Sequence, residues 1–415
     1  MKTETKQRIE QIRRGEVPEG YKQTGKNIVP NTWNRLSFEQ VAIVRSGLVS
    51  PKTEPYSSML HIGPENIEKD TGKIENVRSA SELGLISGKF YFDSSSIVYS
   101  KIRPNLNKVC VPDFEGICSA DCYSIKARDN VDKNYLFTLM LSHQFYKRAV
   151  ACSMRTGMPK INQDDLNAIC LVFPDNLEEQ HKIAAILTTQ DRVIELKEKL
   201  LGEKQRQKKY LMQQLLTGKK RLPGFYGAWS FPKAKELFQS VSDKDHNGDL
   251  AVLSSTQDRG IVPRDEVDID IKYDACSLVN YKKVSKGNFV ISLRSFQGGI
   301  EYSTYTGLVS PAYTVLSSRK EISDGYYKQF FKSTDYINRL NVAVYGIRDG
   351  KQISYEDFGR LRIPYPPIKE QDAIAEVLST ADHEIDLLQQ DIEQEKQKKK
   401  ALMQLLLTGI VRVKT

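Results

Sequence analysis

The sequence lacks the features that would place it in a membrane or outside the cell. No stretch approaches the run of about 20 apolar residues that a spanning helix needs, and the segment Met1 to Arg14 is charged, without the apolar core of a signal peptide. There are six cysteines, with no CxxC pair, and only Cys118 and Cys122 lie close together. A zinc site needs four ligands at characteristic spacings. We therefore expect a cytoplasmic protein that binds no membrane and no metal.

Catalytic signatures are missing as well. There is no GxxxxGK[ST] phosphate-binding loop, no HExxH metal-binding pair and no GxGxxG loop after a strand, and the five histidines are scattered. The nearest match to the Asn-Pro-Pro-Tyr tetrad of DNA methyltransferases is Tyr365-Pro366-Pro367-Ile368, which has the wrong order. We therefore expect that this chain is not an enzyme and holds no cofactor of its own.

The charge balance favours a polyanionic partner. The 415 residues include 61 lysines and arginines against 52 aspartates and glutamates, which gives a net charge of +9. A basic surplus of this size is typical of proteins that bind nucleic acid or an anionic membrane surface. Many cytosolic proteins are mildly basic, however, so the charge alone does not decide between these partners.

The most informative feature of the sequence is an internal repeat. Glu179-Gln180 recurs as Glu370-Gln371, and Leu215-Leu216-Thr217-Gly218 recurs as Leu406-Leu407-Thr408-Gly409, both at an offset of 371 − 180 = 191 residues. A match without gaps over about forty residues is the signature of a duplicated unit. The chain therefore consists of two copies of one sequence unit.

The repeat predicts the domain organisation. The same offset places Gly116-Ile117-Cys118-Ser119 opposite Gly307-Leu308-Val309-Ser310, and the only two tryptophans, Trp33 and Trp229, each open a half. Each half is a globular segment followed by a helix. The predicted boundaries are an N-terminal helical arm at 1–28, a globular domain at 29–176, a helix at 177–218, a second globular domain at 219–366 and a second helix at 367–410.

Both helices show the alternating four- and three-residue spacing of a coiled-coil seam. Each runs for about 39 residues, or roughly 58 Å, and a single helix of that length needs a partner. The simplest partner for each helix is the repeated helix of the same chain, packed antiparallel to it. The alternative is that the two are unrelated amphipathic helices, each packed on its own domain. The predicted seam consists of Ile183, Leu187, Ile194, Leu201, Leu211, Leu215, Ile374, Leu378, Ile385, Leu388, Ile392, Leu402 and Leu406.

The globular segments mix short β-branched or aromatic runs with turn residues and short helix-like pieces, which predicts α+β domains with mostly antiparallel sheets. Basic and amide side chains recur in turn-like places in both halves. Arginine and glutamine suit guanine and adenine edges, and lysine suits phosphates, although a lysine or arginine in a loop is often only a solvated charge. The candidate DNA-binding residues are Lys101, Arg103, Asn105, Lys108, Arg155, Lys160, Arg294, Gln297, Arg348 and Lys351.

Three stretches carry a family resemblance. Leu177-Glu178-Glu179-Gln180, followed by a long helix that ends in Leu215-Leu216-Thr217-Gly218, resembles the specificity (S) subunit of type I restriction-modification enzymes, and so does the twin around Glu370-Gln371. Gly307-Leu308-Val309-Ser310-Pro311-Ala312-Tyr313 is similar to a segment of that family's recognition domains. The resemblance covers nearly the whole chain.

The resemblance implies a fold and a function. The fold would be two repeated α+β target recognition domains joined by two long antiparallel coiled-coil helices, with pseudo-twofold symmetry. Each domain would read one half of a bipartite site in double-stranded DNA. Two methyltransferase (M) subunits would dock on the helices and methylate adenine with S-adenosylmethionine. Restriction (R) subunits would join them and use ATP and Mg²⁺. None of that chemistry would lie in this chain.

Two other kinds of protein remain open from the residues alone. A coiled-coil adaptor would use the same helices to organise a complex while its domains bind protein, and it would show little affinity for DNA. A nonspecific nucleic-acid binder would show affinity that falls with salt but no preferred site. A preference for one sequence over a scrambled one separates both from a specificity protein.

Overall fold

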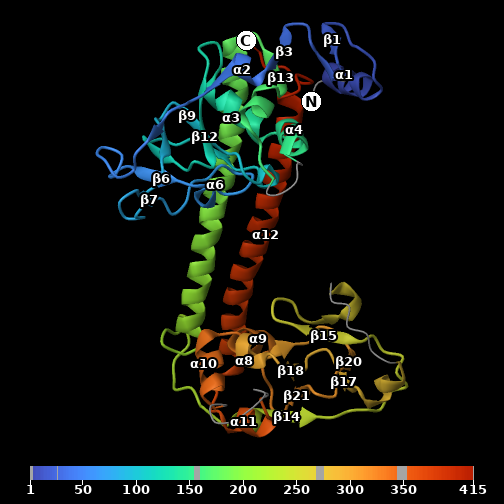
Figure 1. The fold of residues 1–415 in the computed structure, drawn as a ribbon. Coiled ribbons are helices and arrows are strands. Elements are labelled where there is room, and N and C mark those ends of the chain that lie inside the picture. Colours follow the sequence, from blue (N-terminus) through green and yellow to red (C-terminus); the bar gives the residue numbers. More distant parts are fainter. Residues whose placement is uncertain (1–2, 26, 154–158, 268–274, 344–352, 415) are drawn as a thin grey trace. The chain divides into compact units, whose positions relative to one another are not determined.

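The computed structural model describes residues 3–25, 27–153, 159–267, 275–343 and 353–414 (Figure 1). The chain forms two compact units. The first unit comprises Met1–Leu196 and Ile392–Thr415, and the second comprises Lys197–Asp391. The boundary between the units falls inside both long helices, so each unit contains one globular segment together with a part of each helix.

The first unit is built on two larger sheets. A four-stranded antiparallel sheet has the order β10-β9-β12-β4, and a five-stranded sheet has the order β5-β8-β11-β6-β7, in which only β11 and β6 run parallel. The strands are β4 (Ala42–Val44), β5 (Leu48–Val49), β6 (Leu60–Ile62), β7 (Arg78–Ser79), β8 (Lys89–Phe92), β9 (Ser96–Ser100), β10 (Val109–Cys110), β11 (Gly116–Cys118) and β12 (Cys122–Ala127).

The remaining elements of the first unit are two small strand pairs and a set of helices. One strand pair is a hairpin in the N-terminal arm, so the arm is not helical throughout as the sequence predicted. The pairs are β1 (Tyr21–Thr24) with β2 (Asn27–Pro30) and β3 (Trp33–Ser37) with β13 (Cys170–Pro174). The helices are α1 (Thr3–Arg13), α2 (Phe38–Val41), α3 (Lys133–Leu141), α4 (His143–Ser153) and α5 (Gln163–Asn167), with short 3₁₀ turns η1 (Pro64–Asn66) and η2 (Pro104–Leu106).

Three of the cysteines are buried among apolar residues of the first unit. Cys110, Cys118 and Cys122 lie on β10, β11 and β12 and share a cluster with Ile62 and Phe92. Burial raises the pKa of the Cys118 thiol to about 12 and raises that of Cys122 well above its ordinary value. Such thiols stay protonated and behave as small apolar side chains. They are therefore part of the core.

The second unit repeats this plan in a smaller form. Its main sheet has the order β14-β21-β18-β19, beside the pairs β15-β16 and β17-β20. The strands are β14 (Phe238–Val241), β15 (Leu253–Thr256), β16 (Gly260–Pro263), β17 (Lys282–Val284), β18 (Phe289–Ile291), β19 (Glu301–Tyr302), β20 (Gly307–Val309) and β21 (Thr314–Ser318). The helices are α7 (Ala234–Leu237), α8 (Ser295–Gly298), α9 (Asp324–Phe330), α10 (Thr334–Ala343) and α11 (Tyr355–Arg360), with 3₁₀ turns η3 (Arg264–Glu266) and η4 (Ala275–Asn280).

The 191-residue repeat is visible in the strand pairing. β9 pairs with β12 in the first unit, and β18 pairs with β21, their counterparts, in the second. The helices α3, α4 and α5 correspond in order to α9, α10 and α11. Each unit also has its own apolar core, centred on Trp33, Tyr135 and Phe145 in the first and on Phe238 and Phe331 in the second. The α+β class and the duplication predicted from the sequence are confirmed.

The two long helices are α6 (Leu177–Leu215) and α12 (Ile368–Leu406), each 39 residues long (green and red in Figure 1). Within the first unit, Lys399 pairs with Asp191 at 2.5 Å; within the second, Lys204 pairs with Glu384 at 2.7 Å and Lys208 with Asp382. In the second unit, where Lys197 also pairs with Asp391, the partner numbers fall on α12 as they rise on α6, so the two helix segments run antiparallel there. Among the helices of the described ranges, none combines the length and apolarity needed to cross a bilayer.

The predicted seam residues differ in how deeply they are buried along the helices. Those near the ends of the helices are buried within the cores of the globular segments. Ile183, Leu187 and Leu406 belong to the first core, and Leu215, Ile374 and Leu378 belong to the second. Of the rest, Ile194, Ile385 and Ile392 are buried, and Leu201, Leu211, Leu388 and Leu402 are half-buried.

Both helices end at a glycine that the fold requires. Gly218 and Gly409 have φ angles of 70° and 72°, in the left-handed region where a Cβ is strained. A Cβ on Gly218 would also lie 3.1 Å from the Trp229 ring, and one on Gly409 would lie 3.3 Å from the Trp33 ring. The tryptophan that opens each globular segment therefore packs against the end of a long helix.

The repeated Glu-Gln pair explains how each globular segment is attached to a helix start. Glu370, fully buried, accepts two hydrogen bonds from Arg221 at 2.5 and 2.6 Å and one from the Trp229 indole at 2.9 Å. Glu179 accepts the same set from Arg412 and Trp33, at 2.5, 2.7 and 3.2 Å. A buried carboxylate is tolerated when it is paired and hydrogen-bonded in this way.

The glutamine of each pair acts on the backbone. The side-chain oxygen of Gln180 accepts from the Asp132 amide at 2.9 Å, and its NH₂ donates to the Pro174 carbonyl at 3.0 Å. Gln371 bonds in the same way to the Ser323 amide at 2.9 Å and to the Pro366 carbonyl at 2.8 Å. Both glutamines therefore satisfy backbone groups where a helix meets its domain.

Candidate nucleic-acid interface

The first unit brings together two of the segments predicted to bind DNA. Ile102 and Lys160 form an antiparallel bridge, and the Arg103 amide donates to the Pro159 carbonyl at 2.7 Å. Arg103 precedes η2 with a φ of 47°, a left-handed conformation that residues other than glycine adopt rarely. Its side chain is exposed, as are those of Asn105 and Lys160. These three side chains are free of the core and carried on a well-supported turn.

Two other candidates in this turn are held more tightly. The Lys101 ammonium lies 5.2 Å from the Tyr123 ring centroid and 5.8 Å from that of Phe90. Burial lowers the pKa of Lys101, and the nearby positive charge of Lys160 lowers it further. The Lys108 ammonium donates to the Pro64 carbonyl at 2.6 Å. Lys108 therefore has a structural bond in addition to any contact outside the protein. The candidate Arg155 lies outside the described residues.

The second unit presents the equivalent turn. Arg294 occupies the position of Arg103 in the repeat and immediately precedes α8, as Arg103 precedes η2. Arg294 and Gln297 are both exposed. Burial raises the pKa of the neighbouring Tyr313 phenol, and the positive charges of Arg264 and Arg294 partly offset that rise. The turn therefore carries positive charge beside an aromatic ring. The candidates Arg348 and Lys351 lie outside the described residues.

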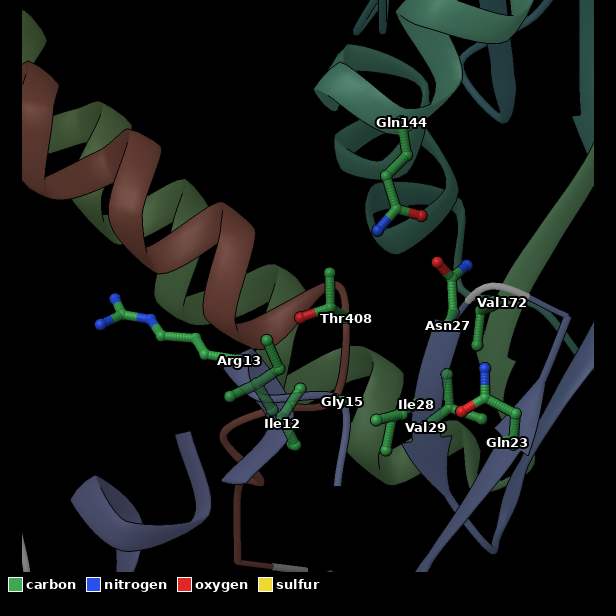
Figure 2. A pocket seen from close by; sticks show the side chains of 11 residues that line it. Ile12, Arg13, Gly15, Gln23, Asn27, Ile28, Val29, Gln144, Val172 and Thr408 are labelled. Carbon is green, nitrogen blue, oxygen red and sulfur yellow. The ribbon is translucent and has the colours of Figure 1, made fainter. Parts of the chain in front are cut away.

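A hollow of about 330 Å³ lies in the first unit between the N-terminal arm and the end of α12 (Figure 2). Among the described residues that line it, Arg13 is the only charged one, so these residues include no carboxylate to act with it. General acid–base chemistry requires such groups within hydrogen-bond reach of a substrate. The lining comprises Ile12, Arg13, Gly15, Gln23, Asn27, Ile28, Val29, Gln144, Val172, Thr408 and Ile410.

The structure also places important residues that sequence reasoning missed. Arg221 and Arg412 hold the buried glutamates, and both follow the repeated Thr-Gly pair at the 191-residue offset, so the repeat itself could have indicated them. The tip of the β15–β16 hairpin, Gln257 to Arg259, is exposed beside the Arg294 turn. The turn signal Asp258-Arg259-Gly260 marks it in the sequence.

Comparison with known proteins gives one matching family model. The model for the type I restriction modification DNA specificity domain matches twice, over residues 65–203 and 227–397, which together span well over half of the chain. The two matches fall on the two repeats. The EcoDI specificity subunit of Escherichia coli is 39% identical over 178 residues, which cover 43% of this chain and 37% of that relative.

More distant relatives match over nearly the whole chain. The putative MjaX specificity subunit of Methanocaldococcus jannaschii is 24% identical and covers 96% of this chain and 98% of its own. Among solved structures, the HsdS subunit from Thermoanaerobacter tengcongensis superposes with a TM-score of 0.53 at 20% identity, covering 93% of this chain and 99% of that one. A chain from a structure of the type I R-M system reaches 0.61 at 18% identity, covering 92% and 99%. At these identities the structures show a shared fold.

Proposed function

Because the chain belongs to the type I restriction-modification DNA specificity family, we propose that it recognises a bipartite site in double-stranded DNA. The first unit reads one half of the site and the second unit reads the other. Exposed arginine, asparagine and glutamine side chains on the Arg103 and Arg294 turns contact base edges, and lysines such as Lys160 contact phosphates.

The single observation that carries this proposal is the duplication of a complete domain. Each unit has its own core, its own Arg turn and its own tryptophan–glutamate–arginine cluster. Two copies of one fold that differ in their exposed residues are suited to two different sequences. A nonspecific binder gains nothing from such differences, because phosphates are the same everywhere along DNA.

We further propose that the chain contributes recognition and leaves the chemistry to partners. Two M subunits methylate adenine with S-adenosylmethionine, and R subunits use ATP and Mg²⁺. Exposed apolar residues on the long helices support a docking role: Ile186, Leu196 and Leu200 on α6 and Leu387 on α12 are each at least 39% exposed. Isolated exposed apolar residues are common, but a series along paired helices favours a protein partner.

Mapping of methylated adenines in genomic DNA tests the function. The full chain is expressed with its M subunits in cells that lack the system, and the expected result is one asymmetric motif with a nonspecific gap. A chimera that carries residues 229–365 of a family member with another specificity is expected to change one half of the motif and keep the other. Methylation without a motif would contradict sequence-specific recognition, and a change in both halves would contradict the assignment of one half-site to each unit.

A further inference from the structure

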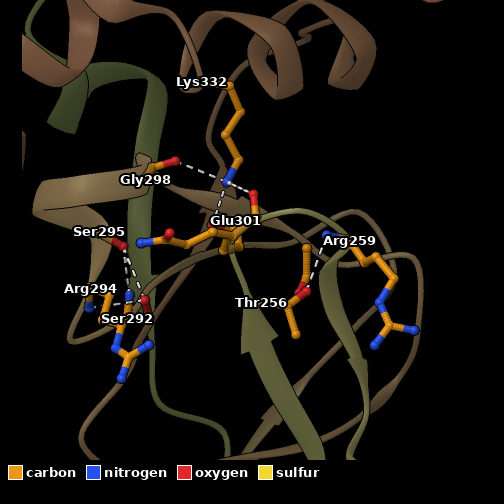
Figure 3. Close-up of polar contacts among 10 residues, drawn as sticks. Thr256, Arg259, Ser292, Arg294, Ser295, Gly298, Glu301 and Lys332 are labelled. Carbon is orange, nitrogen blue, oxygen red and sulfur yellow. Dashed lines mark hydrogen bonds and ion pairs between the residues drawn. The ribbon is translucent and has the colours of Figure 1, made fainter. Parts of the chain in front are cut away.

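The second unit clamps its exposed hairpin tip against the Arg294 turn. The Lys332 ammonium donates to the Gln257 carbonyl of the tip at 3.2 Å and to the Gly298 carbonyl of α8 at 2.9 Å, and it pairs with Glu301 (Figure 3). Glu301 is 2% exposed. Burial raises the pKa of the Glu301 carboxyl, and the charge of Lys332 offsets part of that rise. One lysine therefore ties the hairpin to α8.

Close glycine contacts fix the same junction. A Cβ on Gly298 would lie 2.8 Å from Cγ of Gln257, and a Cβ on Gly260 would lie 2.8 Å from the Tyr302 carbonyl oxygen. A side chain at position 260 would clash with backbone, and one at position 298 would force the Gln257 side chain to move, so both glycines favour this close approach. Gly260 also has a φ of 77°. The tip is therefore packed closely against β19 and α8.

The first unit holds the equivalent tip by different chemistry. Its loop is closed by an antiparallel bridge between Ile67 and Ile74 and contains Asp70-Thr71-Gly72, which resembles Asp258-Arg259-Gly260 at an offset of 258 − 70 = 188, three residues short of the repeat offset. The Asn107 side chain donates to Asp70 at 3.2 Å and to the Leu141 carbonyl at 3.2 Å. In the repeat, Asn107 corresponds to Gly298 and Leu141 corresponds to Lys332. The junction of tip and Arg turn is therefore kept in both units.

The two tips carry different exposed side chains, although each tip contacts the turn that follows the arginine of its own unit. Lys69-Asp70-Thr71 occupies the first tip and Gln257-Asp258-Arg259 the second, and all six side chains are exposed. Lysine, glutamine and arginine are donors that suit base edges and phosphates. Arg259 uses one N–H on the Glu266 carbonyl, at 3.0 Å, and its guanidinium has further donors. Supported tips that carry different exposed donors in the two units are suited to reading two different sequences.

From these contacts we infer that the two hairpin tips, residues 69–71 and 257–259, determine DNA specificity together with the Arg103 and Arg294 turns. Arg259 and Gln257 contact bases of the half-site that the second unit reads, and Lys69 acts in the other half-site. Lys332 and Asn107 are positioning residues that place each tip beside its turn. This inference rests on the proposed function.

The test compares Arg259→Ala with Arg360→Ala in the full chain expressed with its M subunits. Arg360 is the matched control, because it is an exposed arginine of the same unit on α11, which packs against α7. For Arg259→Ala we expect relaxed methylation at one or two positions of one half-site. In competition binding, the preference over a duplex changed at those positions should fall about 5- to 100-fold. Arg360→Ala should leave the motif unchanged.

A substitution in the first tip provides the matching test for the other half-site. Lys69→Ala is expected to alter the half-site that Arg259→Ala leaves intact. An unchanged motif in both tip variants, or an equal loss of binding to all sequences, would overturn the inference while leaving the proposed function in place. A wild-type complex that methylates without any motif would instead contradict the function itself.

Discussion

At the scale of single residues, three buried glutamates contribute most to the predictions, because each is hydrogen-bonded or ion-paired to specific side chains. Glu179 and Glu370 each accept hydrogen bonds from an arginine and from a tryptophan indole, and Glu301 forms an ion pair with a lysine. Removing a partner from a buried charge costs more than the bond was worth, because the remaining charge is left unsolvated. Substitutions at these positions should therefore have large and separable effects.

Glu370→Gln tests the cluster at the start of α12. The substitution keeps the shape but removes the charge that Arg221 and Trp229 bind, so we expect the second unit to lose about 2–3 kcal/mol of stability. Chemical denaturation of the full chain with its M subunits measures the loss. Glu376→Gln, at an exposed position of the same helix, is the control and should be close to neutral. Equal stability of both variants would mean that the cluster does not hold the domain to the helix.

Asp93 gives a prediction for pH. Burial alone would raise the pKa of this carboxyl, but hydrogen bonds from Ser95, Arg45 and Ser96 outweigh it and hold the pKa well below its usual range. A lowered folded-state pKa gives stability that is present above the unfolded pKa of about 4 and is lost as the pH falls below it.

The variant Asp93→Asn should therefore melt below the wild type at pH 7, and the difference should shrink as the pH drops below about 4. Thermal melts of both proteins across this range provide the measurement. The control Asp113→Asn changes an exposed carboxylate and should shift the melting temperature little at either pH. A difference for Asp93→Asn that stays constant with pH would rule out this carboxylate as the source.

At the scale of elements, one glycine inside α6 and one just after it should respond in opposite directions to the same substitution. Gly218 follows the helix with a φ of 70°, and a Cβ there would press on Trp229. Gly202 lies inside the helix, and a Cβ there would meet nothing within 4 Å. The two positions therefore separate the cost of left-handed backbone from the gain of helix propensity.

Gly218→Ala should destabilise the protein by about 1–2 kcal/mol, and Gly202→Ala should stabilise it by up to about 1 kcal/mol. Denaturation midpoints of the two variants and the wild type are the measurement. A stabilising Gly218→Ala would contradict the left-handed end of α6. A destabilising Gly202→Ala would indicate a contact on that face of the helix, such as a docked partner.

At the scale of the whole molecule, we expect that the length of the two long helices sets the length of the nonspecific gap, or spacer, between the two half-sites of the proposed motif. Four residues inserted after Leu196 in α6 and four after Asp391 in α12 lengthen each helix by about 6 Å and nearly preserve the 3.6-residue period. We expect a spacer about one or two base pairs longer, with both half-sites unchanged. Methylation mapping of the insertion variant measures it. An active variant with the original spacer would show that helix length does not set the spacer. The control is the same insertion in the exposed loop after Gly224, which should leave the spacer unchanged.

The sequence by itself determined the parts that are periodic or repeated. The duplication, both 39-residue helices, their glycine ends and the α+β class follow from the 191-residue offset and from local spacing. These features are local, because helix periodicity and turn residues act over a few neighbours. The Arg103 and Arg294 turns were also visible, because the repeat placed two arginines at equivalent positions.

Only the tertiary structure decided which distant segments meet. Arg412 reaches Glu179 across 233 residues of sequence, and it forms the cluster that Arg221 forms with Glu370 in the other unit. Lys332 likewise meets a hairpin tip that lies 75 residues away in the chain. Such contacts depend on how two cores pack and on which charges burial leaves in need of a partner, and no local pattern encodes either. The hairpin tips became candidates for reading DNA only when those contacts placed them beside the arginine turns.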